Sequence, residues 1–311
     1  MEEFSDRVKA LLDSQLKDWN LASANYRLLS NVKTREIDFI DFRLLVQFNP
    51  ERIRSSAAKV DAKSIEARPC FLCEKNRPAE QKGLAFSDNF VILVNPFPIF
   101  PRHLTIPSEE HTLQRIRDNF GNMLDLSKAL PDYVVFYNGP ECGASAPDHL
   151  HFQAGNRGFL PIEEDFTNNQ LVTRVKSGRH LEIWQWKKYL RGIITLHGSS
   201  EELIKNSFSG FYNRLAEIQS GKPEPMLNII VYFTGDNWTV HIIPRKLHRP
   251  SQYFAEEKKR ILLSPASVDL GGVLIVPREE DFEKITADDI RDIFSQVCMD
   301  ESEINKLTSH V

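Results

Sequence analysis

The sequence predicts an α+β fold built from two similar halves, each a largely antiparallel sheet with a helix packed against it. Short apolar and β-branched runs separated by Pro- and Gly-containing turns are typical of strands. Their order around the predicted helices occurs twice along the chain, which indicates an internal duplication. We therefore expect an intramolecular pseudo-dimer, with one half comprising residues 1–165 and a degenerate half comprising residues 166–311.

The N-terminal half begins with a predicted amphipathic helix over residues 3–19, in which apolar residues recur at helical spacing. The alternation after it predicts strands at Tyr26–Leu29 and Ile37–Phe48. A polar, basic segment follows. Its Arg52 and Arg54 are candidate contacts to a phosphate, although the composition of the segment is also that of a solvated loop.

The rest of this half alternates strands with one helix. Three further strands are predicted, at residues 90–94, 103–107 and 133–138. Ser108 is a plausible N-cap for a helix that runs to about Leu130, because its hydroxyl can accept from a backbone N–H of the first turn. His111 would then lie in that first turn.

The C-terminal half shows the same order of elements. Strands are expected at residues 183–189, 191–196, 228–233, 238–243 and 273–276, and helices at residues 201–219 and 286–297. His241 occupies the position that His151 has in the first half. Thr239 and Ile243 replace the polar residues that flank His151, so the second half lacks the full constellation.

The residues His149, His151 and Gln153 are spaced by two. On a strand this spacing directs all three side chains to one face, with Leu150 and Phe152 on the other. A neutral imidazole can attack an α-phosphorus and hold the nucleotidyl group as a phosphoramidate. The alternative is a pair of ordinary strand histidines.

A histidine nucleophile needs donors for the charge that develops on the phosphate oxygens. Gln153 and Ser145 are candidates, and the small residues around Ser145 leave room for a substrate to approach the backbone. The basic run that contains Arg245 and Lys246 is a candidate site for the acceptor phosphate. Such a run is also typical of a solvated turn.

Cys70 and Cys73 form a CxxC pair, which has the spacing of a zinc knuckle. Pro-containing, charged flanks favour metal binding over redox chemistry, and two packed free thiols are the other alternative. With His111 and His149 the pair would complete a closed Cys2His2 site, in which structural zinc braces the strand that carries His151.

The composition excludes several classes of function. The net charge is −4 and the pI about 6.2, so nucleic acid is not an expected partner. No apolar run has membrane-spanning length and the first residues do not form a signal peptide. Four cysteines in 311 residues are typical of a reducing compartment, so we expect a cytoplasmic location.

The run GASAPDHLHFQ, residues 143–153, resembles the signature of the histidine-triad (HIT) superfamily in its nucleotidyltransferase branch, which carries HxHxQ. The branch includes galactose-1-phosphate uridylyltransferase, GDP-hexose phosphorylases and diadenosine tetraphosphate phosphorylase (ATP adenylyltransferase). The run HLTIPSEEH, residues 103–111, is similar to the strand-to-helix segment of HIT proteins, whose second histidine is a zinc ligand in zinc-bearing members.

The resemblance implies a HIT-like fold and a role for each matching residue. His151 matches the nucleophile and Gln153 the amide that contacts the phosphate. Asn138 and Ser145 match residues that contact the nucleotide. The zinc set is matched by Cys70, Cys73, His111 and His149. Asp148 replaces the usual proline or asparagine before the first histidine.

These observations together predict an enzyme that transfers a nucleoside monophosphate from an NDP-sugar to phosphate or a sugar phosphate, through a covalent nucleotidyl-histidine. Two alternatives stay open: a diadenosine tetraphosphate phosphorylase, and a zinc-stabilised nucleotide-binding protein without turnover. The expected partners are the nucleotide-sugar or dinucleoside polyphosphate and the phosphate acceptor, with no nucleic acid and no membrane, and a homodimer is compatible with this function.

Overall fold

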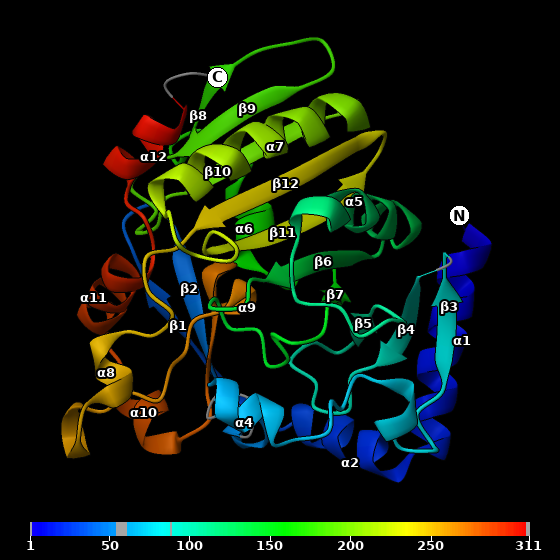
Figure 1. The fold of residues 1–311 in the computed structure, drawn as a ribbon. Coiled ribbons are helices and arrows are strands. Elements are labelled where there is room, and N and C mark those ends of the chain that lie inside the picture. Colours follow the sequence, from blue (N-terminus) through cyan, green and yellow to red (C-terminus); the bar gives the residue numbers. More distant parts are fainter. Residues whose placement is uncertain (1, 54–60, 88, 309–311) are drawn as a thin grey trace.

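A ten-stranded antiparallel sheet forms the centre of the molecule (Figure 1). The computed structural model describes residues 2–53, 61–87 and 89–308. From edge to edge the strands are β3 (Gly83–Phe86), β4 (Phe90–Val94), β5 (His103–Pro107), β7 (His151–Asn156), β6 (Tyr133–Asn138), β11 (Leu227–Thr234), β12 (Asn237–Pro244), β10 (Ile194–Gly198), β9 (Glu182–Trp186) and β8 (Val172–Lys176).

The sheet consists of two five-stranded halves that are joined at their centre. β3 to β7 come from the first part of the chain and β8 to β12 from the second, and the halves meet where β6 pairs with β11. Counted outward from the centre, the strands are β6, β7, β5, β4 and β3 in the first half and β11, β12, β10, β9 and β8 in the second. Relative to the order along the chain, the two arrangements are the same. The expected α+β fold with two similar, largely antiparallel halves is therefore confirmed.

Helices α5 (Phe120–Ala129) and α7 (Glu201–Ile218) cover one face of this sheet (Figure 1). The rings of Phe120 and Phe208 stack between them at a centroid distance of 3.8 Å. Their apolar faces pack on inward-facing residues of both halves in one continuous core, because alternate strand residues point to this side. The remaining helices of this core are α1 (Glu2–Asp18), along the outer strands β3 and β4, and α12 (Glu301–Thr308), beside α7.

A second core on the opposite face brings residues 37–46 together with residues 261–298 of the C-terminal half. There β2 (Arg43–Phe48) pairs with β1 (Lys33–Asp38) and, in parallel, with β13 (Val273–Val276). The other elements are α2 (Asn20–Leu29), η1 (Pro50–Arg52), α4 (Ala62–Glu66), η2 (Glu74–Asn76), η3 (Arg117–Asn119), α6 (Pro161–Asp165), α8 (Ser251–Phe254), η4 (Glu257–Lys259), α9 (Ser267–Leu270), α10 (Glu279–Lys284) and α11 (Ala287–Val297).

Three local expectations for the N-terminal half are wrong. Tyr26–Leu29 belongs to helix α2, where the buried residues Ala22 and Asn25 have helical spacing. The stretch Ile37–Phe48 is not one strand, because a turn separates β1 from β2. No helix begins at Ser108: α5 starts only at Phe120, after η3.

The delayed start of α5 has a physical reason. The carbonyl of Thr112 accepts from the backbone N–H of Leu150, and the N–H of Gln114 donates to Pro147, so this segment is held against the approach to β7. A helix could not offer these backbone groups to another segment. Among the described residues, no helix has both the length and the apolar character needed to cross a membrane.

Candidate active site and metal cluster

A cavity of about 620 Å³ lies beside the start of β7 and receives residues from both halves of the chain. His151 and Gln153 line it from β7, and Asp269 lines it from α9 in the C-terminal part. The small residues before β7 permit this close approach. Gly143 has a φ of 97°, and a Cβ there would lie 2.5 Å from the Cβ of Ala266.

His151 is held in the form that a nucleophile requires. Its Nδ1 lies 2.8 Å from the carbonyl oxygen of His149, so Nδ1–H donates and Nε2 carries the lone pair. The side-chain amide of Gln114 fixes the backbone by accepting from the N–H of His151 at 2.7 Å and donating to its carbonyl at 3.0 Å. Burial lowers the pKa of His151 to about 4, so the ring is neutral near pH 7.

His103 orients the amide of Gln153. The backbone N–H of Ile99 donates to Nδ1 of His103 at 3.1 Å, so the ring proton is on Nε2. Nε2 lies 3.1 Å from Oε1 of Gln153 and donates to it. The NH₂ group of Gln153 is then left for the cavity, where it can donate to a phosphate oxygen. Burial lowers the pKa of His103 to about 3, which keeps this ring neutral as well.

Asn138 and Ser145, which the resemblance matched to nucleotide contacts, both line the cavity, and their contact with a nucleotide stays a prediction. Oδ1 of Asn138 accepts from Asn228 Nδ2 at 2.8 Å and from the backbone N–H and the hydroxyl of Ser267 at 2.9 and 2.7 Å. The C-terminal half thereby fixes this side chain. Because the oxygen is saturated, the amide NH₂ is the group that Asn138 can offer to a ligand.

The prediction that Arg245 and Lys246 contact the substrate needs correction. Arg245 is fully buried and does not line the cavity, since its guanidinium donates to Asn228 Oδ1 and to four backbone carbonyls. Lys246 forms an ion pair with Glu303 at 3.3 Å. Arg245 supports the site only indirectly, because it holds the Asn228 amide that in turn contacts Asn138.

The members of the basic run that do line the cavity are His248 and Arg249. Nε of Arg249 donates to Ser264 Oγ at 3.2 Å. Arg52 lines the cavity from the N-terminal half and donates to the carbonyl of Phe97 at 2.9 Å. Arg54 lies outside the described residues. Two members of the basic run thus face the cavity, but the sequence did not show which ones.

Asp269 is the acidic group of the cavity wall, and the sequence analysis missed it. Its Oδ1 accepts from the N–H of Ile275 and its Oδ2 from the N–H of Ala266, at 2.9 and 2.8 Å. Burial raises its pKa to about 6. An aspartate in a short helix gives no local signal of such a position.

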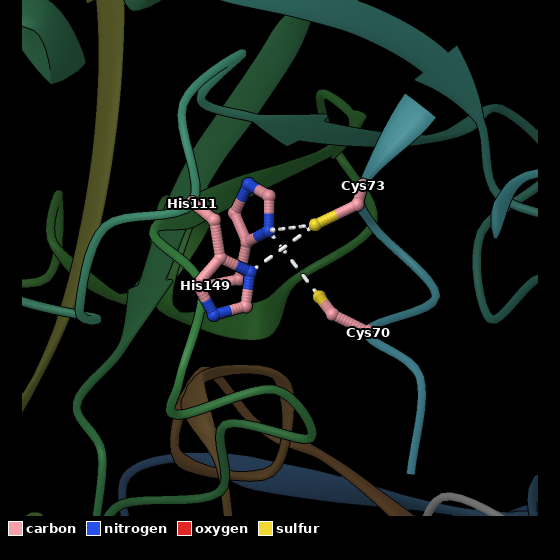
Figure 2. A group of neighbouring side chains, drawn as sticks. All are labelled: Cys70, Cys73, His111 and His149. Carbon is pink, nitrogen blue, oxygen red and sulfur yellow. Dashed lines mark hydrogen bonds between the residues drawn. The ribbon is translucent and has the colours of Figure 1, made fainter. Parts of the chain in front are cut away.

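Cys70, Cys73, His111 and His149 converge on one point next to the cavity (Figure 2). Their ligand atoms all lie within 4.8 Å of one another. Sγ of Cys70 is 3.3 Å from His149 Nδ1, and Sγ of Cys73 is 3.1 Å from His111 Nδ1 and 3.6 Å from His149 Nδ1. His149 thus turns toward this cluster, and because β7 begins only at His151 it does not share the cavity face with His151 and Gln153.

The cluster fits the requirements of zinc. Bonds of about 2.0 Å to nitrogen and 2.3 Å to sulfur give a tetrahedron with edges of about 3.3–3.8 Å, close to the spacing of these atoms. Nε2 of His149 donates to the carbonyl of Ser108 at 2.8 Å, which leaves Nδ1 unprotonated and facing the sulfurs. Nε2 of His111 lies 3.8 Å from Asp148 Oδ2, so a carboxylate supports the second ring.

His241 in the second half has no comparable surroundings. Its Nδ1 forms a hydrogen bond of 2.8 Å with the hydroxyl of Thr195, which also accepts from the indole N–H of Trp186. The rings of Phe166 and Trp186 stand edge-on to it. His241 is fully buried and does not line the cavity. Cross-strand pairing from β7 through β6 and β11 to β12 aligns His241 with Gln153 across the sheet.

Comparisons with known proteins agree with this architecture. Residues 11–156 match a domain of unknown function, DUF4922, and residues 166–311 match the GDPGP1-like C-terminal domain. No curated protein matches the chain in sequence.

Two solved structures of yeast Ap4A phosphorylase Apa2 have a similar fold. The complex with Ap4A is 16% identical over 92% of this chain and 95% of the yeast chain, with a TM-score of 0.61. The complex with AMP is 18% identical over 91% and 94%, with a TM-score of 0.57. The C-terminal part of the chain is therefore similar to the GDPGP1-like C-terminal domain, and the chain has the fold of an Ap4A phosphorylase, as the resemblance to the HIT nucleotidyltransferase branch predicted.

Proposed function

We propose that this protein is a nucleotidyl phosphorylase that transfers a nucleoside monophosphate from an NDP-sugar to inorganic phosphate or a sugar phosphate. The observation that supports it most is the state of His151. Its ring is neutral, its Nδ1–H donates to a backbone carbonyl, and it lines a cavity beside the amide of Gln153. A nucleophilic imidazole must be neutral, oriented and accessible to its substrate, and the amide adds a donor for the phosphate.

In the first step, Nε2 of His151 attacks the α-phosphorus and forms a P–N bond. The bond from that phosphorus to the bridging oxygen breaks, and the sugar phosphate leaves with the electron pair. The NH₂ group of Gln153, turned outward by His103, donates to a non-bridging oxygen as charge develops there. The hydroxyl of Ser145 and the amide NH₂ of Asn138 are further donors on the cavity wall.

In the second step, an oxygen of the acceptor phosphate attacks the same phosphorus. The P–N bond breaks and His151 returns to its neutral form. The product that leaves is a nucleoside diphosphate when inorganic phosphate is the acceptor, and an NDP-sugar when a sugar phosphate is the acceptor. The acceptor is an anion and needs cationic partners. Arg52 and Arg249 line the cavity and take the place in this proposal that Arg245 and Lys246 had in the sequence-based prediction.

We assign zinc to the cluster of Cys70, Cys73, His111 and His149, as a structural ion. When bound it ties the CxxC segment to the residue two positions before the nucleophile. Nε2 of His149 donates to the carbonyl of Ser108, and the carbonyl of His149 accepts from Nδ1–H of His151. The chain also divides, in this proposal, into an N-terminal half that ends at residue 165 and a C-terminal half that completes its site.

The proposal is tested by trapping the intermediate. The purified protein is incubated separately with UDP-glucose, GDP-glucose, ADP-glucose and diadenosine tetraphosphate, and intact mass spectrometry detects an acid-labile nucleotidyl adduct. We expect an adduct with an NDP-sugar in the wild type and none in His151→Ala. An adduct that persists in His151→Ala would show that the covalent mechanism is wrong.

The likeness to the Ap4A phosphorylase fold favours a second candidate, a dinucleoside polyphosphate phosphorylase. An adduct formed only with diadenosine tetraphosphate would support it. If none of the four compounds gives an adduct although nucleotides bind, the protein is a nucleotide-binding protein without turnover. The same four compounds therefore separate the three functions.

A further inference from the structure

Arg68 lies between the metal cluster and the cavity that contains His151. It comes two residues before Cys70, lines the cavity, and places its guanidinium 5.3 Å from the ring centroid of Phe71, another lining residue. The metal cluster therefore carries an arginine on its cavity side. No part of the mechanism described above uses this side chain.

One edge of the guanidinium is fixed by Asp148. Nη2 of Arg68 donates to Asp148 Oδ1 at 2.8 Å. The other carboxylate oxygen lies 3.8 Å from Nε2 of His111, and Asp148 directly precedes His149 in the chain. Both neighbours of Asp148 are candidate metal ligands, so its position depends on the cluster. The same contacts explain why an acidic residue stands at this position, despite the anionic substrate nearby.

The other edge of the guanidinium lacks an acceptor. Nη1 of Arg68 is buried and has no hydrogen-bond partner in the part of the chain that the structure describes. A buried N–H of a charged group without an acceptor is unfavourable, because it has lost water and gained nothing in return. Since Arg68 lines the cavity, a ligand bound there is the source from which an acceptor can come.

We propose that Arg68 binds a phosphate group of the substrate through this edge, while Asp148 and the metal cluster hold it in place. Guanidinium pairs with phosphate through short, charge-assisted hydrogen bonds, and a side chain that is already fixed loses little conformational entropy on binding. The proposal rests on the proposed function for the presence of a phosphorylated nucleotide. It adds the residue through which the metal cluster contributes to substrate binding.

The test compares nucleotide with nucleoside. Dissociation constants of ADP, GDP and UDP, and of adenosine, guanosine and uridine, are measured by calorimetry for the wild type and for Arg68→Met and Arg68→Lys. For the nucleotide that binds best, we expect Arg68→Met to weaken binding by about 10–100-fold, with the matching nucleoside unaffected. Arg68→Lys should lose less, because it keeps the charge but not the two-edged geometry.

Two variants separate this role from a structural one. Arg77→Met is the matched control, because Arg77 also belongs to the knuckle, where its Nε donates to the carbonyl of Leu72, but it does not line the cavity. It should bind nucleotide like the wild type. Asp148→Asn, compared with the wild type after both have been loaded with zinc, should weaken nucleotide binding by about 3–10-fold, because it releases Arg68 without removing it.

Each outcome decides the proposal. Nucleotide affinity that is unchanged in Arg68→Met, or an equal loss of nucleotide and nucleoside affinity, would overturn it. A loss of the same size in Arg77→Met would show that a disturbed knuckle is the cause, and would overturn it too. If the wild type binds no nucleotide, the proposed function is wrong and the proposed role of Arg68 is wrong with it. If only the role of Arg68 is wrong, the wild type still forms the nucleotidyl adduct.

Discussion

The orientation of the Gln153 amide predicts the effect of a nearly isosteric change, Gln153→Glu. In the wild type, His103 Nε2–H donates to Gln153 Oε1, and the NH₂ group remains for the substrate phosphate. A glutamate would keep the hydrogen bond from His103, because one carboxylate oxygen replaces Oε1. The other oxygen would replace the donor and present a negative charge to the phosphate. We expect the fold to tolerate this change and the chemistry to fail.

The size of the effect follows from two contributions. A hydrogen bond to a charged group is worth about 1.5–3 kcal/mol, which corresponds to about 10–150-fold in rate. Repulsion between the new carboxylate and the phosphate adds to this loss. Removing one comparable donor from an oxyanion site costs about 10²–10³-fold. We therefore expect adduct formation in Gln153→Glu to be at least about 10²–10³-fold slower than in the wild type.

The assay is single-turnover formation of the nucleotidyl adduct, quenched at intervals and followed by intact mass. Gln153→Met separates the two contributions, because it removes the donor without adding charge, and it should lose about 10–100-fold. His103→Phe leaves the donor present but no longer oriented, so adduct formation should slow by about tenfold. Its free energy of unfolding should fall by about 1–3 kcal/mol, since the N–H of Ile99 loses its acceptor. Adduct formation in Gln153→Glu within threefold of the wild type would refute this reasoning.

Three further predictions concern the metal, the second half and pH. Wild-type protein should contain about one zinc per chain by elemental analysis and Cys70→Ser should lose it, whereas a metal-free wild type whose stability does not respond to chelation would contradict the assignment. His241→Phe should form the adduct within about twofold of the wild-type rate, since His241 does not line the cavity; a loss like that of His151→Ala would contradict a single site. Burial raises the pKa of Glu224 to about 7, so the folded protein keeps a proton that the unfolded chain releases above about pH 4.5. The contribution of Glu224 to the free energy of unfolding therefore falls as the pH rises between these two values. In urea unfolding, Glu224→Gln should therefore gain about 1–2 kcal/mol relative to wild type between about pH 5 and pH 7, and a difference that is independent of pH would show that Glu224 does not titrate in this window.

The features that the sequence predicted well depend on local patterns. Most strands of the central sheet are short apolar runs between turn residues. The strands β4, β5 and β6 of this sheet, and β13 of the three-stranded sheet, have the predicted bounds. Period-two spacing placed His151 and Gln153 together on the cavity wall. The fold class followed from the repeated order of these elements, which a single sequence displays.

The features that the sequence did not reveal depend on contacts between distant segments. Asp269 faces the cavity only because α9 packs beside β6 and β11. In the sequence, His103 is one residue of a predicted strand without a further signal. It lies beside Gln153 only because β5 pairs with β7. Arg245 carries the charge expected of a substrate contact, yet the fold buries it against backbone carbonyls. Local composition does not contain this information.

The C-terminal half completes the site that it no longer duplicates. Its own histidine, His241, is enclosed by aromatic rings and makes its hydrogen bond to Thr195. The same half nevertheless holds Asn138 through Asn228 and Ser267, and Arg245 in turn holds Asn228. A pseudo-dimer whose halves evolve separately can lose one constellation and keep the contacts that the other needs. In the proposed mechanism the chemistry is thereby confined to the cavity that contains His151, and separating the halves would remove support from that cavity without changing His151.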